Sequence, residues 1–140
     1  MRRLPDWHAR LTRWLVAQAG RRWRPGSVDC ALFAAGAVRA QTGIDLARGL
    51  RGRYRSVRAG VALLRARGFD GPEAFLAAHL PAVPRLRART GDIAVIDTPA
   101  GPAFGVLDGE AVHVLHPRGG PGLVPATTAR AFHAVGRCPR

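Results

Sequence analysis

One segment, DCALFAAGAV at residues 29–38, limits the possible folds of this chain more than any other. Residues 34–37 within it are all Ala or Gly, so small side chains fall on several faces of a helix. Such a helix can lie close against other backbones, whereas a typical surface helix has one apolar stripe and one polar face. The segment therefore predicts a helix that is central and buried.

Capping residues are available at both ends of this predicted helix. Ser27 or Asp29 can cap its N-terminus, and Gly43 can end it. Cys30 then lies in the first turn, at the positive end of the helix dipole and among free backbone N–H groups. That environment favours the thiolate, so the sequence predicts a thiol pKa below the usual value of about 8.5.

Three further helices are predicted from apolar spacing and end signals. The first carries Trp7, Leu11, Trp14 and Leu15 on one side, with Asp6 as its cap. The others run from Val57 to Arg67 and from Pro72 to Leu80. The segments 44–54 and 81–90 are predicted as loops.

After Gly91 the pattern changes to short β-like runs. They cover 92–96, 103–107 and 111–115, and single strands are predicted at 123–124 and 132–135. Asp108-Gly109-Glu110 between two of the runs is a strong tight-turn signal. Helices followed by antiparallel strands are typical of the α+β class. No repeat or change of composition marks a boundary, so residues 1–140 are predicted to form one domain.

The formal net charge of +13 raises the question of a nucleic-acid partner. All 22 residues counted as Lys or Arg are Arg, and the chain contains no Asn. The arginines are scattered, and no run of aromatic residues alternates with them as a stacking platform would require. The charge is therefore attributed to composition, with some electrostatic help in docking to an acidic partner, and nucleic acid is not favoured.

Targeting, disulfide and metal signals are weak throughout the sequence. The first residues, MRRLPDWHARLTRWLVAQAG, lack the apolar core and cleavage site of a signal peptide, and no stretch approaches membrane-spanning length. We therefore expect synthesis in the cytoplasm and no membrane span. Cys30 and Cys138 do not make a disulfide scaffold, although the sequence leaves their pairing open. No metal or other cofactor is predicted, because His113 and His116 lack a nearby third ligand.

A catalytic thiol needs an imidazole within hydrogen-bond reach and a polar group that orients the imidazole. In a helix-then-sheet domain these partners come from strands packed on the helix. The predicted strands offer His113, His116 and His133. The alternative is that Cys30 is a small buried hydrophobe and that His113 faces solvent on a half-exposed strand.

Three short motifs stand at or near the starts of predicted elements: Trp23-Arg24-Pro25-Gly26, Asp29-Cys30-Ala31-Leu32-Phe33 and Gly91-Asp92-Ile93-Ala94-Val95. Together they resemble the NlpC-type cell-wall peptidases of the papain-like superfamily. More closely, the chain is similar to a small branch of that superfamily found among bacteriophage and gene-transfer-agent-like tail genes. The resemblance implies a papain-like, NlpC-type fold, in which N-terminal helices pack on a C-terminal antiparallel sheet.

The resemblance also implies roles for individual residues. Cys30 takes the position of the nucleophile, and Asp29 that of the helix start. Matching Phe104-Gly105-Val106 to the Val-Gly-hydrophobic segment of the family puts the general-base histidine's position on Ala103, which cannot take a proton. Either His113 or His116 from the neighbouring strand serves as the base, or the site is degenerate.

Three functions follow as hypotheses. The first, favoured because of Ala103, is a catalytically degenerate tail component at the tip or hub, which contacts other tail proteins. Its expected location is the virion tail, after assembly in the bacterial cytoplasm. The second is an active cysteine peptidase or amidase that cleaves peptidoglycan peptides during cell entry, with Cys30 as nucleophile. The third and most remote is a small basic nucleic-acid-binding protein.

Overall fold

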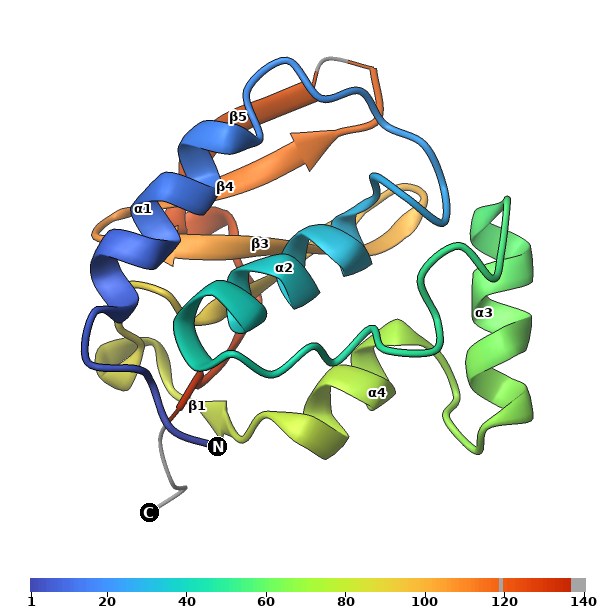
Figure 1. Cartoon of the computed structure of the whole chain (residues 1–140), viewed down its shortest axis with the longest axis horizontal. Coiled ribbons are helices and arrows are strands. Elements are labelled where there is room, and N and C mark those ends of the chain that lie inside the picture. Colours follow the sequence, from blue (N-terminus) through green and yellow to red (C-terminus); the bar gives the residue numbers. More distant parts are fainter. Residues whose placement is uncertain (119, 137–140) are drawn as a thin grey trace.

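The structure is a computed structural model that describes residues 1–118 and 120–136. Within these residues four α-helices come first and six strands follow, which confirms the predicted α+β class (Figure 1). The helices are α1 (Trp7–Ala17), α2 (Cys30–Thr42), α3 (Val57–Ala66) and α4 (Pro72–His79). The strands are β1 (Ala82–Val83), β2 (Ile93–Thr98), β3 (Gly101–Asp108), β4 (Ala111–His116), β5 (Gly120–Pro125) and β6 (Ala131–His133). Two short 3-10 turns cover Arg85–Arg87 and Ala126–Thr128.

The described strands form one antiparallel sheet in the order β1-β6-β2-β3-β4-β5. The meander predicted for the C-terminal half is present from β2 to β5, and Gly109 lies at a φ of +61° in the tight turn between β3 and β4. β6 departs from the meander, because it returns to pair with both β2 and β1. The predicted connector over 81–90 also contains the two-residue strand β1, which the sequence pattern did not predict.

β3 begins at Gly101, earlier than the predicted start at residue 103. Pro102 therefore lies inside the strand, opposite Asp97 of β2. A proline removes a backbone donor and is tolerated where no neighbouring strand needs that donor. The pairing of β3 with β4 starts only at Gly105, so this part of β3 has no β4 partner.

The sheet has an apolar core on each face. The helix-side core packs α1, α2 and α4 against one face, where Figure 1 shows α1 and α2 lying across the strands. The second core lies on the opposite face. The helix-side core takes Ile93, Val95, Phe104, Val106 and Leu115 from the sheet, and the second core takes Ala94, Ile96, Leu107, Val112, Val114 and Phe132.

α2 is the central, buried helix that its composition predicts. Asp29 caps it, and Gly43 ends it at a φ of +79°. A Cβ on Gly36 would clash with Cζ2 of Trp14 and would lie 2.8 Å from Cε2. The missing side chain at Gly36 therefore allows the indole of Trp14, on α1, to rest directly on α2.

The remaining helices lie close to their predicted bounds, with one difference at α1. Asp6 precedes α1, but its side chain caps no backbone N–H. Its Oδ1 instead accepts a hydrogen bond from Nε of Arg10 at 2.9 Å. None of the described helices combines the length and the apolar composition needed to cross a bilayer.

Candidate active site

Cys30 is the first residue of α2, as predicted, and it is a free cysteine. Asp29 precedes it in extended backbone, and the Leu32 N–H donates to Asp29 Oδ1 at 2.9 Å. This is the N-cap geometry expected of Asp at a helix start. Cys138 lies outside the described residues, so its pairing remains an open prediction.

The carboxylate of Asp29 also joins α2 to two loops. It is 5% exposed, and its Oδ2 accepts hydrogen bonds from the Gly26 N–H at 2.9 Å and the Tyr54 hydroxyl at 2.6 Å. The ring of Tyr54 lies against Gly60 of α3, where a Cβ would be 3.0 Å from Cδ2. Asp29 therefore fixes the first turn of α2 relative to the loop before it and to α3. No sequence motif pointed to Tyr54, the single tyrosine of the chain.

The helix start does not activate the thiol of Cys30. Burial raises the pKa of Cys30 above its ordinary value, and the negative charge of Asp29 acts in the same direction. The backbone N–H groups of Phe104, Cys30 and Ala31 lower this pKa, but by less than the rise. The predicted depression of the thiol pKa is therefore wrong. Desolvation outweighs the helix terminus, and the residue that caps the helix adds an unfavourable charge.

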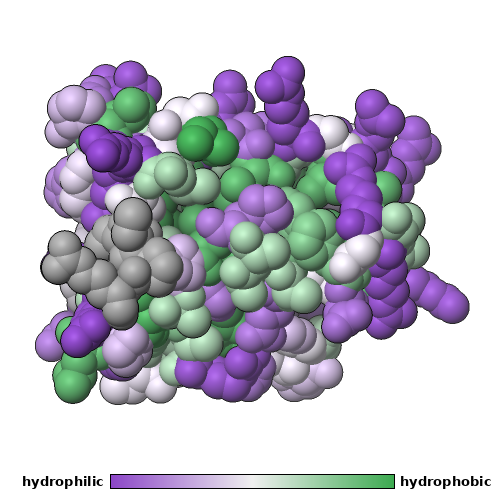
Figure 2. Space-filling model, turned by 90° about the horizontal axis from the view of Figure 1, so that it is seen from below, coloured by the Kyte–Doolittle hydropathy of each residue, from purple (hydrophilic) through white to green (hydrophobic). Residues whose placement is uncertain are grey.

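Cys30 lines a mostly apolar cavity of about 540 Å³. Its walls come from α2, α3, α4, the turn between β2 and β3, and the end of β4. The volume lies in the range of sites for small ligands and peptide side chains. Figure 2, which views the molecule from below, shows apolar side chains across the middle of that face and hydrophilic ones around its edge. The apolar wall includes Leu46, Leu50, Leu63, Leu64, Phe75 and Leu76.

His113 is held by a carboxylate away from Cys30. It lies opposite Val106 in the β3–β4 pair, and its Nε2 is 3.1 Å from Oδ2 of Asp108. A carboxylate that holds an imidazole is how a general base is oriented. However, His113 is not among the described residues that line the cavity around Cys30. The structure therefore does not bring His113 to the thiol.

His116, at the end of β4, lines the same cavity as Cys30. Like Val114 of the second core, two residues earlier on the strand, His116 projects from the sheet face away from α2. The imidazole lies over Gly122 of β5, where a Cβ would be 2.9 Å from Nε2. Within the described residues no hydrogen bond or ion pair joins Cys30 to an imidazole. Cys30 and His116 thus share a cavity without forming a bonded pair.

The strand register places Ala103 on the face of the sheet away from α2. Ala103 pairs with Ile96 of the second core, whereas Phe104 pairs with Val95 of the helix-side core. Since side chains alternate between the two faces, position 103 lies on the face away from α2, and from there Ala103, like His116, lines the cavity that contains Cys30.

Phe104 occupies the helix-side position beside the thiol. Its side chain is 3% exposed and belongs to the helix-side core. The ladder between β3 and β4 starts one residue later, at Gly105 opposite Val114. The Phe104 N–H lies outside that ladder and interacts with the Cys30 sulfur instead. Phe104 therefore contributes a buried apolar side chain and no proton acceptor to the surroundings of Cys30.

His133, the remaining strand candidate, has a structural contact. It is buried in β6, and its Nδ1 is 3.0 Å from the carbonyl oxygen of Leu80, just after α4. As for metals, the described residues contain no group of three or more His, Cys, Asp or Glu side chains placed to hold an ion.

These features define a class: an α+β domain with a cysteine at the start of a central helix and an apolar cavity beside it. The chain belongs to the family described as a domain of unknown function, DUF6950, whose model matches residues 2–135. A comparison with curated proteins found no match.

Proposed function

We propose that this chain is a structural component of a bacteriophage or gene-transfer-agent-like tail, at the tip or hub. It has a papain-like, NlpC-type scaffold whose thiol has no catalytic role. The environment of Cys30 is the main observation in favour of a loss of catalysis. Burial raises the pKa of the thiol, and no imidazole among the described residues is hydrogen-bonded to it. The tail assignment is supported by the similarity of the Asp29–Phe33 and Gly91–Val95 motifs to tail-gene members of the superfamily.

Thiol attack on an amide needs a thiolate and a group that accepts its proton. Burial raises the pKa of Cys30 and so disfavours its thiolate. His113 is bonded to Asp108 outside the cavity, and Ala103 has no titratable group. Phe104, the next residue on β3, packs its apolar side chain into the core between the sheet and the helices. The scaffold is therefore kept for assembly with other tail proteins inside the bacterial cytoplasm and then in the virion.

One observation favours a second candidate, an active cysteine peptidase or amidase that acts on peptidoglycan. His116 lines the cavity that contains Cys30. In this alternative a movement of His116 past the end of β4 would bring its imidazole to the thiol. Cys30 would then attack the carbonyl carbon, and backbone N–H groups at the start of α2 would help to hold the oxyanion.

Quantitative mass spectrometry of purified particles, combined with a peptidoglycan digest, separates the two candidates. We expect the chain at a fixed number of copies per particle, and no release of peptidoglycan peptides by the purified protein. The proposal would be contradicted if the chain were absent from particles. It would also be contradicted if the protein released peptides and both Cys30→Ser and His116→Ala abolished the release. The exposed His8→Ala serves as the matched histidine control.

A further inference from the structure

A second cavity, of about 450 Å³, lies between α1, α2 and the loop that precedes α2. Four arginines line it: Arg10, Arg21, Arg39 and Arg51. The one carboxylate in its described lining is that of Asp29, which already accepts hydrogen bonds from Gly26, Leu32 and Tyr54. The lining is therefore strongly basic.

Few carboxylates of the described residues form strong ion pairs with these arginines. Arg10 pairs with Asp6 and Arg51 with Asp45, at 2.9 and 3.1 Å, but these pairs are solvent-accessible and such pairs contribute little. Arg21 donates to the neutral side chain of Gln18 at 3.2 Å.

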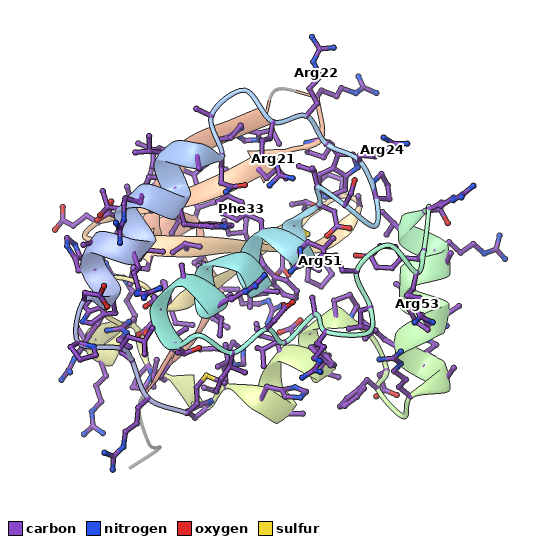
Figure 3. All side chains as sticks on the ribbon, viewed as in Figure 1. Arg21, Arg22, Arg24, Phe33, Arg51 and Arg53 are labelled. Atoms are coloured by element: carbon purple, nitrogen blue, oxygen red, sulfur yellow. The ribbon has the colours of Figure 1, made fainter. Side chains whose placement is uncertain are left out.

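Arg39 makes no ion pair or side-chain hydrogen bond within the described part of the chain. Figure 3 shows Arg21 and Arg51 around Phe33, with Arg22, Arg24 and Arg53 farther out on the same side of the molecule. An anionic ligand in the cavity would therefore meet guanidinium groups that have no strong internal partner.

Below the arginines the lining is apolar. Trp14 and Phe33 pack together with ring centroids 5.0 Å apart, and Leu32 and Leu115 also line the cavity. A site with this lining suits a ligand that presents carboxylates at its edge and an apolar side chain at its centre. Guanidinium groups bind carboxylates through two parallel hydrogen bonds, and apolar burial adds free energy in proportion to area.

We propose that this cavity binds an acidic segment of a partner protein in which carboxylate side chains alternate with large apolar ones. The carboxylates pair with Arg21 and Arg39, and an apolar side chain packs on the partly exposed Trp14, which Phe33 supports from below. Cys30 is not among the described residues that line this cavity, so the proposal goes beyond the proposed function and does not depend on whether Cys30 reacts.

A nucleic acid fits the same cavity less well. Single strands bind by stacking bases on open aromatic faces beside a basic track. Phe33 is only 4% exposed, and the indole of Trp14 rests on Gly36 and Phe33. The described lining therefore offers one partly buried indole rather than a run of aromatic faces on which successive bases could stack, whereas a single aliphatic side chain needs only that contact area.

Fluorescence anisotropy with three labelled probes tests this proposal. The probes are a short peptide of alternating Glu and Leu, a matched peptide of alternating Glu and Ser, and a single-stranded oligothymidine. We expect the Glu-Leu peptide to bind at least about tenfold more tightly than either other probe. Arg39→Glu should weaken its binding about tenfold, because an unpaired cation is replaced by an anion.

The matched control is Arg58→Glu, an identical charge change at an exposed site on α3. It should change the affinity by less than about twofold. Equal weakening by Arg39→Glu and Arg58→Glu would overturn the proposal, since binding would then reflect net charge alone. Tighter, Arg39-dependent binding of oligothymidine, or no saturable binding of the Glu-Leu peptide, would also overturn it. Circular dichroism spectra would establish that both variants are folded.

Discussion

Replacing Asp29 with Ala is expected to lower the free energy of unfolding by about 3 to 5 kcal/mol. The carboxylate accepts hydrogen bonds from the N–H groups of Gly26 and Leu32 and from the hydroxyl of Tyr54. Loss of a helix N-cap costs about 1 kcal/mol, and each buried donor left without an acceptor costs about 1 to 3 kcal/mol. This is a large fraction of the stability of a domain of this size.

Urea unfolding followed by circular dichroism measures this change. Tyr54→Phe removes one of the three donors and should cost only about 1 kcal/mol. Asp97→Ala is the matched control, because it removes an exposed carboxylate that pairs with Arg130 and should cost less than about 1 kcal/mol. A loss of stability for Asp29→Ala no larger than that of Asp97→Ala would show that the Asp29 network does not hold the helix start.

Replacing Gly36 with Ala should destabilise the protein by about 2 kcal/mol, opposite in sign to the usual effect. In an exposed helix interior, Gly→Ala stabilises by about 1 kcal/mol through helix propensity. Here the new Cβ would clash with Cζ2 of Trp14 and lie 2.8 Å from Cε2, so α1 and α2 must separate or the indole must move. Overpacking of this kind typically costs about 1 to 3 kcal/mol.

A double-mutant cycle with Trp14→Leu isolates this contact. In the Trp14→Leu background the Cβ at position 36 no longer meets an indole, so Gly36→Ala should become neutral or stabilising. Thermal unfolding of the four proteins gives the coupling energy. Equal effects of Gly36→Ala in both backgrounds would contradict the close approach of α1 and α2 at this glycine.

The helix that carries the site could be predicted from sequence because its signals are local. Asp29 supplies the cap, Gly43 supplies the left-handed end, and the small residue at Gly36 indicates a close neighbour. Each of these is a property of one position and its immediate surroundings. The strand β6 could not be placed in the same way, because its pairing of Ala131 with Val95 joins distant segments without any local pattern.

The details of the site depended on register and burial, which the sequence pattern does not contain. A motif match could assign a role to position 103, but only the pairing of Ala103 with Ile96 shows on which face its side chain lies. The helix start of Cys30 was predictable, whereas the desolvation that raises its pKa follows from the packed cavity. The hydroxyl of Tyr54 donates a hydrogen bond to Asp29 from a segment whose sequence predicts only a loop.

The central claim, that the thiol of Cys30 is unactivated, is tested most directly by the pH dependence of its alkylation. Iodoacetamide reacts with the thiolate, so a raised pKa lowers the rate at neutral pH and moves the midpoint upward. In the Cys138→Ser protein we expect a midpoint above about 8.5, the value for a free cysteine, and slower reaction at pH 7 than N-acetylcysteine shows. A midpoint below about 7, with Cys30 more reactive than the free thiol, would contradict this account.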